Sequence, residues 1–334
     1  MKTEVIYTIK YLTGTSFRTK YLFFRRQWMK SFGTWVPRQL WIGITNRCLC
    51  NCVHCLVGPS LNKNGKTEFT TAEYRRLIDE GCSLGFMEAV YFGGEPLLRN
   101  DIVELVDYAN TKGLLASLFT NGVMLSKEMA DRLKGAGLNM CNVSLDSANP
   151  ATHDRLRGLN GCFNKAVKGI RYIVANEIKC SIWTYASKED IRSGLIDLRN
   201  LILLGKELRV DKINILFPMA SGNWLCSWSE MLTAEERGNV RALHAPPFVN
   251  FEFPDEGDHC SAGKVFIYIS PEGDVYPCPA LSHCVLGNIR SQQLNSILRN
   301  LINNNAAGSQ STCSGECWIN KRNSDDRKFW SKSI

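Results

Sequence analysis

The sequence predicts an α/β protein in which a partial barrel of parallel strands, covered by helices, is followed by a small cysteine-rich domain. Two observations predict the barrel. Six short runs are apolar throughout rather than alternating, which is typical of parallel strands buried on both faces, and helical patterns separate them. A third observation predicts the second domain, because from about residue 256 the pattern becomes that of a hairpin and one helix, with five cysteines.

The six predicted strands are followed in turn by helical patterns. The strands occupy residues 39–45, 88–92, 114–119, 139–145, 179–185 and 211–217. The helix at 70–85 has clear ends, because Thr70 and Glu73 form a capping box and Gly85 is a typical stop. Further helices are expected at 126–137 and 163–176. These units predict a partial (β/α)6 TIM-like barrel, in which ligands bind at the carboxyl ends of the strands.

The C-terminal region has a different pattern. GKVFIYISPEGDVYPC at 263–278 alternates apolar and polar residues around a turn at 271–274, and this predicts a β-hairpin. A helix is expected at 291–302. We therefore divide the chain into a basic, aromatic N-terminal segment (1–37), the barrel (38–250) and a small cysteine-rich hairpin-plus-helix domain (256–325).

Composition narrows the functional class. The chain has 334 residues, of which 44% are hydrophobic, and it contains no apolar run long enough to span a membrane. The N-terminus lacks the apolar core of a signal peptide, so we expect a cytoplasmic protein. Thiols stay reduced in that compartment, so the 14 cysteines indicate metal binding or thiol chemistry rather than disulfides. Five of them stand alone and are expected to be small core residues: Cys82, Cys141, Cys162, Cys180 and Cys226.

Most of the positive charge lies in the N-terminal segment. Residues 1–38 hold eight Lys or Arg and one acid, whereas the whole chain has a net charge of +8. The nearly neutral remainder does not predict a nucleic-acid-binding surface. Residues 17–35 interleave these cations with aromatic residues. We expect a helix whose aromatic face packs across the open side of the barrel, and the alternatives are docking to an acidic peptide or to an anionic membrane.

Polar, glycine-rich or cysteine-rich segments follow the first four predicted strands. ITNRCLCNCVHCLV (44–57) follows the first, and GGEP (93–96), TNG (120–122) and SLDS (144–147) follow the next three. Because the carboxyl ends of parallel strands meet at one edge, we expect these segments to form one site. A zinc site on all four cysteines of the first segment is one interpretation, and ordinary turns and loop caps are another for the last two segments.

The spacing of Cys48, Cys52 and Cys55, C-x3-C-x2-C, resembles the radical S-adenosylmethionine (SAM) superfamily. The resemblance implies that three thiolates hold a [4Fe–4S] cluster whose fourth iron is left open for SAM. It also implies one-electron cleavage of SAM to a 5′-deoxyadenosyl radical, which abstracts a hydrogen atom from the substrate. Cys50 is not required by this pattern.

The same resemblance implies a SAM site at the strand ends. GGEP would contact the SAM amino group, His54 takes the position whose residue approaches adenine, and later strand ends line the ribose and methionine. The implied SAM-binding residues are His54, Gly93, Gly94, Glu95, Asn121, Ser144 and Asp146. HDRLRGLNGCF (153–163) also resembles a segment of this superfamily, without an assigned role.

The C-terminal cysteines resemble the SPASM and twitch extensions of radical SAM proteins, which bind auxiliary [4Fe–4S] clusters. Cys260 and Cys278 bracket the predicted hairpin, and Cys317 matches the closing ligand. The fourth ligand would be Cys313 or Cys284. Five cysteines are fewer than the seven of a full SPASM domain, so we expect one auxiliary cluster; a structural zinc site is the alternative.

The resemblance implies a peptide or protein substrate first, with a flavodoxin- or ferredoxin-type electron donor. The second hypothesis is oxidation or rearrangement of a small molecule, such as an aminocyclitol, a nucleoside sugar or a tetrapyrrole; a single auxiliary cluster favours it. The third is an iron–sulfur or zinc scaffold without catalysis. If the reaction is an epimerisation, Cys226 is a candidate hydrogen donor.

Overall fold

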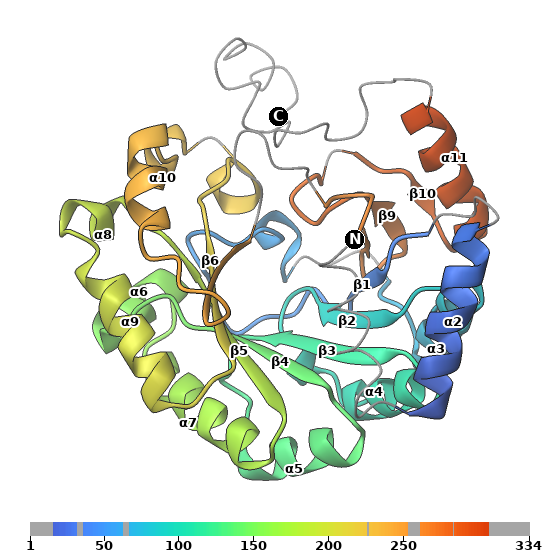
Figure 1. Cartoon of the computed structure of the whole chain (residues 1–334), viewed down its shortest axis with the longest axis horizontal. Coiled ribbons are helices and arrows are strands. Elements are labelled where there is room, and N and C mark those ends of the chain that lie inside the picture. Colours follow the sequence, from blue (N-terminus) through green and yellow to red (C-terminus); the bar gives the residue numbers. More distant parts are fainter. Residues whose placement is uncertain are drawn as a thin grey trace.

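The computed structural model describes residues 16–31, 36–62, 67–225, 227–252, 261–282 and 284–306. Its centre is a curved parallel sheet in which the first six strands lie side by side in chain order (Figure 1). They are β1 (Gln39–Gly43), β2 (Glu88–Phe92), β3 (Leu115–Thr120), β4 (Met140–Ser144), β5 (Lys179–Tyr185) and β6 (Lys212–Leu216). The predicted strands and the partial barrel are therefore confirmed.

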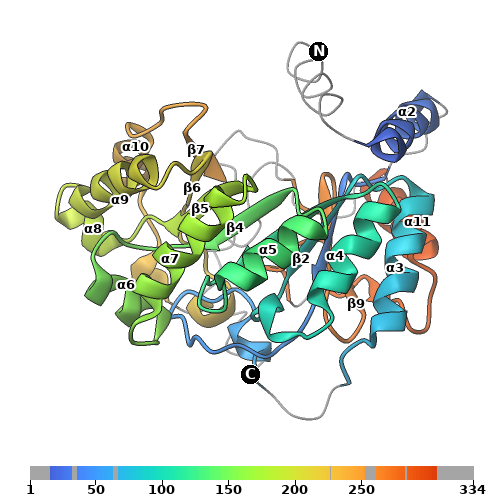
Figure 2. The same cartoon turned by 90° about the horizontal axis from the view of Figure 1, so that it is seen from below.

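Helices cover the outer face of this sheet (Figure 2). They are α3 (Thr71–Leu84), α4 (Ile102–Thr111), α5 (Lys127–Gly135), α6 (Pro150–Arg157), α7 (Cys162–Ala175), α8 (Lys188–Arg192), α9 (Ile196–Glu207) and α10 (Ala234–Arg241). The predicted capping box forms at Thr70 and Glu73, and Gly85 ends α3 in the left-handed conformation. Leu40 and Ile42 of β1 are fully buried in the main core.

Four further strands extend the sheet at both edges. β7 (Val249–Glu252) pairs in parallel with β6, and β8 (Phe266–Ile269) pairs in parallel with β1. The predicted hairpin is formed by β8 and β9 (Asp274–Tyr276), followed by β10 (Gly287–Asn288) and α11 (Leu294–Ala306). The pairing of β8 with β1 makes the hairpin part of the barrel sheet. It also gives hydrogen-bond partners to the backbone groups at the edge of β1 that faces away from β2.

Arg290, which follows the hairpin, fastens the C-terminal region to the barrel. Its guanidinium donates to the carbonyl oxygens of Thr67 and Glu68 at 2.8 and 3.2 Å. It also pairs with Glu73 at 3.1 Å and lies 4.8 Å from the centre of the Phe69 ring. These contacts fix the hairpin beside the loop that follows β1.

The N-terminal segment contains α2 (Phe17–Ser31), which lies against the ends of α3 and α4 on the outside of the barrel (Figure 1). The expectation that its aromatic face packs across the open side of the barrel is wrong. The inward face instead carries Leu22 and Arg26, and the Arg26 guanidinium donates to the carbonyl oxygens of Gly85 and Val36 at 2.8 and 2.6 Å. Arginines of α2 can dock it here because the last carbonyl oxygens of α3 have no partner within their own helix.

Three of the isolated cysteines are buried, as predicted: Cys141, Cys162 and Cys180. Cys82 is half-buried, and Cys226 lies outside the described residues. The described part of the chain contains no disulfide. None of its helices combines the length and the hydropathy needed to cross a membrane.

Candidate active site

One pocket lies at the carboxyl ends of the strands, and it gathers segments that are distant in the sequence. The loop after β1 contributes the four clustered cysteines, and the ends of β2, β3 and β4 contribute the predicted polar residues. The predicted residues that line it are Cys48, Cys52, His54, Cys55, Gly93, Gly94, Asn121, Ser144, Asp146 and Cys278. Glu95 is fully buried behind this lining.

The end of β2 holds one side of the cysteine loop. The amide N–H groups of Gly94 and Glu95 donate to the carbonyl oxygens of Thr45 and Arg47 at 2.7 and 2.8 Å. A Cβ atom at Gly94 would lie 2.3 Å from the Arg47 oxygen, a distance that no side chain tolerates. The glycine pair is therefore required by the close approach of two backbones.

Two other segments hold the rest of the cysteine loop. The amide N–H groups of Asn51 and Val53 donate to the carbonyl oxygens of Arg157 and Leu156 at the end of α6, at 2.9 and 3.1 Å. From the loop after β6, Asn223 Nδ2 donates to the Cys52 carbonyl at 2.8 Å. The loop is thus held by three barrel segments: the end of β2, the end of α6 and the loop after β6.

The four cysteines of this loop offer thiolate ligands at the rim of the pocket. Among the described residues, no three His, Cys, Asp or Glu side chains gather as ligands of one metal ion. Tetrahedral zinc needs four ligands at about 2.0–2.3 Å from one centre.

Two N–H donors point at the sulfurs of this loop. Arg157 Nη1 lies 3.6 Å from Cys52 Sγ, and Asn121 Nδ2 lies 3.9 Å from Cys48 Sγ. A hydrogen bond from Cys50 and the guanidinium of Arg157 lower the pKa of Cys52 to about 6. Both donors stabilise thiolate, which is the form that binds iron.

Arg157 belongs to a buried ion pair with Asp146. Its Nε lies 2.6 Å from Asp146 Oδ2, and its Nη2 donates to Oδ1 at 2.9 Å. Burial raises the pKa of Asp146, but the charge and hydrogen bond of Arg157, together with smaller contributions from His54 and His153, keep that pKa below its usual value. The sequence predicted Asp146 at the site but did not identify Arg157 as its ion-pair partner. The only sequence signal for Arg157 was the segment HDRLRG after the fourth strand.

His54 is buried between aromatic rings and is held neutral. Its ring centre lies 4.7 Å from that of Tyr185 and 5.5 Å from that of Trp224, and its Nε2 lies 3.3 Å from Asp146 Oδ2. Burial lowers the pKa of His54 to about 4 despite the nearby carboxylate. This side chain therefore offers an uncharged, planar surface to the pocket.

Glu95 connects the ends of β2 and β3 and is poised to ionise. Its carboxyl group accepts hydrogen bonds from Thr120 Oγ1 and the Asn121 amide at 2.8 Å each, and from the Leu97 amide at 3.1 Å. Burial raises the pKa of Glu95 to about 7, although these hydrogen bonds oppose the shift. A cation in the pocket would favour its ionised form.

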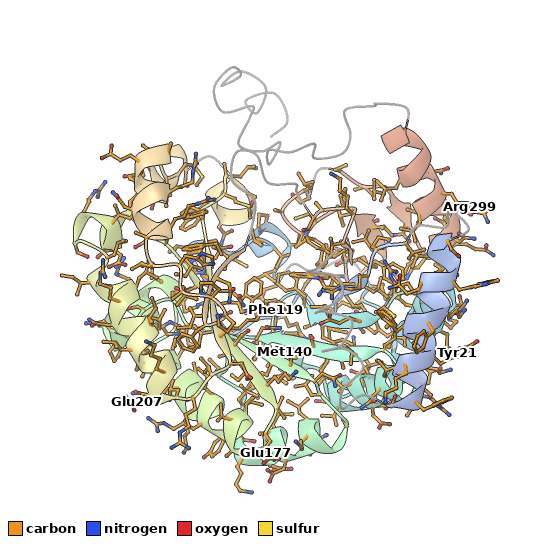
Figure 3. The ribbon with its side chains drawn as sticks, viewed as in Figure 1. Tyr21, Phe119, Met140, Glu177, Glu207 and Arg299 are labelled. Atoms are coloured by element: carbon orange, nitrogen blue, oxygen red, sulfur yellow. The ribbon has the colours of Figure 1, made fainter. Side chains whose placement is uncertain are left out.

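The pocket has an aromatic floor inside the barrel, where Figure 3 places Phe119. The rings of Trp41 and Phe119 lie 5.2 Å apart, and those of Phe119 and Trp183 lie 4.7 Å apart. Phe92 and Phe266 complete this floor. The only cationic lining residue among those described is Arg157, which Asp146 already neutralises.

The second cysteine group reaches the same pocket. Cys278 follows the hairpin, packs in a small apolar cluster with Phe266 and Leu281, and lines the pocket with Pro279. Cys284 packs against the same cluster. Cys260, Cys313 and Cys317 lie outside the described residues, so the ligand set of this group stays a prediction.

Comparisons with known proteins agree with this geometry. The sequence model of the radical SAM superfamily matches residues 42–191, and that of SPASM, an iron–sulfur cluster-binding domain, matches residues 260–318. An AdoMet-dependent heme synthase of Methanosarcina barkeri is 29% identical over 296 residues, which are 79% of this chain and 82% of that protein.

Two further relatives are named for peptide substrates. A PqqA peptide cyclase of Xanthomonas oryzae pv. oryzae is 27% identical over 282 residues, which are 79% of this chain and 74% of that protein. The crystal structure of Streptococcus suis SuiB bound to the precursor peptide SuiA has a TM-score of 0.67 at 16% identity, covering 88% of this chain and 75% of that one. At this level of identity, the likeness to SuiB shows a shared fold alone.

The two matched regions contain the two cysteine groups, and together they hold every residue of the pocket lining except Trp41 and Leu216. The chain therefore belongs to the radical SAM superfamily: it is an enzyme with a [4Fe–4S] cluster, SAM as cofactor and a C-terminal SPASM domain for an auxiliary iron–sulfur cluster.

Proposed function

We propose that this enzyme modifies a peptide or protein by abstracting hydrogen from an apolar or aromatic residue held above the aromatic floor. The observation that carries the proposal is the character of the pocket. Its floor is built from Trp41, Phe92, Phe119, Trp183 and Phe266, and the described lining offers no cation beyond the neutralised Arg157. Such a pocket favours an uncharged, largely apolar group.

Cys48, Cys52 and Cys55 are the proposed iron ligands, and Cys50 is not one. The spacing of the three, the N–H donors at Cys48 and Cys52, and the rigid loop support this assignment. When bound, the cluster and SAM supply one-electron cleavage of a carbon–sulfur bond and hence a radical that abstracts hydrogen. The chain positions both groups and keeps water out of the pocket.

The residues around the cysteines have distinct proposed roles toward SAM. Glu95 supplies negative charge for the SAM ammonium group, through its own carboxylate or through the Asn121 backbone that it orients. His54 presents its neutral ring to adenine. Gly93 and Gly94 leave room for the ligand, and Asn121, Ser144 and Asp146 line the space for the ribose and methionine.

The auxiliary cluster is proposed to bind to Cys260, Cys278 and Cys317, with Cys284 or Cys313 as fourth ligand. Cys278 lines the pocket, which supports a place for this cluster next to the substrate. A flavodoxin- or ferredoxin-type protein is the proposed source of electrons. Cys226 keeps its proposed role as hydrogen donor only if the product is epimerised.

A tetrapyrrole is the second candidate substrate, because the heme synthase relative matches over 82% of its own length. Tetrapyrroles of heme biosynthesis carry several carboxylates, and a buried carboxylate without a cationic partner is unfavourable. The described lining contains no cation to receive one apart from Arg157. The pocket therefore supports the peptide candidate more than the tetrapyrrole.

A substrate screen tests the proposal. The anaerobically reconstituted enzyme is given SAM, dithionite and either a pool of aromatic-containing synthetic peptides or iron coproporphyrin III. We expect 5′-deoxyadenosine to rise above its substrate-free rate, with a mass change in a peptide, only in the first case. A rise with iron coproporphyrin III, together with loss of carboxyl groups from it, would select the second candidate.

A further inference from the structure

The outer face of α2 carries a stripe of four large aromatic side chains. They stand at positions 17, 21, 24 and 28, and this spacing of three and four puts them on one face of a helix. Phe17, Tyr21, Phe24 and Trp28 are 83%, 60%, 61% and 65% exposed. Among the described residues, every exposed Phe, Tyr or Trp belongs to this stripe. Figure 3 places Tyr21 at the rim of the molecule, far from Phe119.

The aromatic side chains are exposed although α2 itself is packed against the barrel helices. Opposite the stripe, Leu22 and Arg26 are buried, and Met29 lies within contact distance of the space beside Gly85. Arg25 Nη1 donates to the Cys82 carbonyl at 3.1 Å, and Arg18 donates to the Thr111 carbonyl. These bonds hold α2 against the ends of α3 and α4 in one orientation, with its aromatic face outward.

The charge of α2 selects an anionic partner. Its sequence, FRTKYLFFRRQWMKS, contains five Lys or Arg and no acid. Arg18 and Arg25, which are seven positions apart, border the stripe on one side. Lys20 borders it on the other side. A second copy of the same helix would bring cations against cations, which disfavours self-association.

The shape and residue types of the stripe favour a lipid surface over an acidic peptide. α2 projects from the row of barrel helices as a ridge (Figure 2). A peptide helix is usually received in a hydrophobic groove rather than on a ridge, and aromatic residues flanked by cations are typical of helices that lie in a membrane interface. We propose that the aromatic face of α2 docks this enzyme peripherally on an anionic lipid surface.

Vesicle co-sedimentation tests the docking. The full-length, anaerobically reconstituted enzyme is mixed with vesicles of phosphatidylcholine alone or of an equal mixture with phosphatidylglycerol. We expect binding to the anionic vesicles, little binding to phosphatidylcholine, and release as salt is raised. The variant Phe17→Ser/Tyr21→Ser/Phe24→Ser should lower the partition coefficient by about tenfold or more, because it removes three aromatic side chains that the lipid interface would bury.

A matched control separates this face from general hydrophobicity. Ile196 and Leu203 on α9 are 58% and 62% exposed, so Ile196→Ser/Leu203→Ser removes exposed apolar surface elsewhere on the protein. This control should bind vesicles as the wild type does. The 5′-deoxyadenosine yield without vesicles should be equal in all three proteins, which keeps the result independent of the proposed substrate.

Several results would overturn the docking proposal. The wild type could ignore the anionic vesicles, or the triple variant could bind them as well as the wild type. Sedimentation equilibrium could show a dimer that the triple variant dissociates, which would assign the stripe to self-association. Binding to soluble poly-L-glutamate that depends on the same three aromatics, without vesicle binding, would assign it to an acidic peptide.

Discussion

Arg157 connects the cysteine loop after β1 to the polar side of the pocket. It donates toward Cys52 Sγ at 3.6 Å and pairs with Asp146 at 2.6 Å. N–H donors to cluster sulfurs raise the reduction potential, because they stabilise the extra negative charge of the reduced cluster. We expect Arg157→Gln/Asp146→Asn, which removes both charges together, to lower the potential of this cluster in an EPR-monitored redox titration.

The control for Arg157 stands on the same helix. Arg155 of α6 is exposed and pairs with Glu189 at 2.7 Å, so Arg155→Gln should leave the potential unchanged. Arg157→Gln alone should also destabilise the fold by about 3–5 kcal/mol, because Asp146 would be left buried without its cation. An unchanged potential in the double variant would assign Arg157 a purely structural role.

Glu95 predicts a dependence of stability on pH. Burial raises its pKa from an ordinary value of 4.5 to about 7, so the folded state binds the proton more tightly than the unfolded state. The SAM-free protein should therefore lose about 3 kcal/mol of stability from this group as pH rises from about 4.5 to 7. Denaturation at several pH values should show that Glu95→Gln removes this part of the loss. Equal pH profiles for both proteins would contradict the assignment.

At the scale of elements, the turn after β2 positions the cysteine loop through backbone contact alone. A side chain at Gly94 would meet the Arg47 carbonyl at 2.3 Å. Gly94→Ala should therefore displace the loop, lower the iron content and reduce SAM cleavage by about tenfold or more, as expected when positioning at an active site is lost. Iron analysis and 5′-deoxyadenosine measurement check both effects.

Gly135, near the end of α5, is the matched control for Gly94. A Cβ atom there would meet nothing within 4 Å. Gly135→Ala should keep iron and activity, and it should stabilise the protein by about 0.5–1 kcal/mol because alanine favours a helix. Equal losses in both alanine variants would show that the turn after β2 has no special role.

The elements differ in how far the sequence predicts them. β1 to β6 and α3 were predictable, because apolar runs and caps are local signals. The pairing of β8 with β1 and the four-residue β7 were not, since both depend on partners distant in the chain. The orientation of α2 was predicted wrongly, because nothing in the local sequence shows that Arg25 and Arg26 bond to carbonyl oxygens at the end of α3, a contact between segments distant in the chain.

At the scale of the whole molecule, the barrel brings distant segments to one pocket. The spacing of Cys48, Cys52 and Cys55 and the GGEP segment identified most of its lining from the sequence. Arg157 and the aromatic floor were not identified, because α6 and alternate strand positions carry no motif that marks them as facing the pocket. The hairpin closes one edge of the sheet and brings Cys278 to the same space.

The central claim is that three of the four cysteines after β1 hold the cluster at which SAM is cleaved. The decisive measurement is 5′-deoxyadenosine formed anaerobically with dithionite and SAM by the wild type, by Cys50→Ala and by Cys48→Ala/Cys52→Ala/Cys55→Ala. We expect product from the first two proteins and none from the third, whose remaining iron would be that of the auxiliary cluster. Product from the triple variant, or its loss in Cys50→Ala, would contradict the claim.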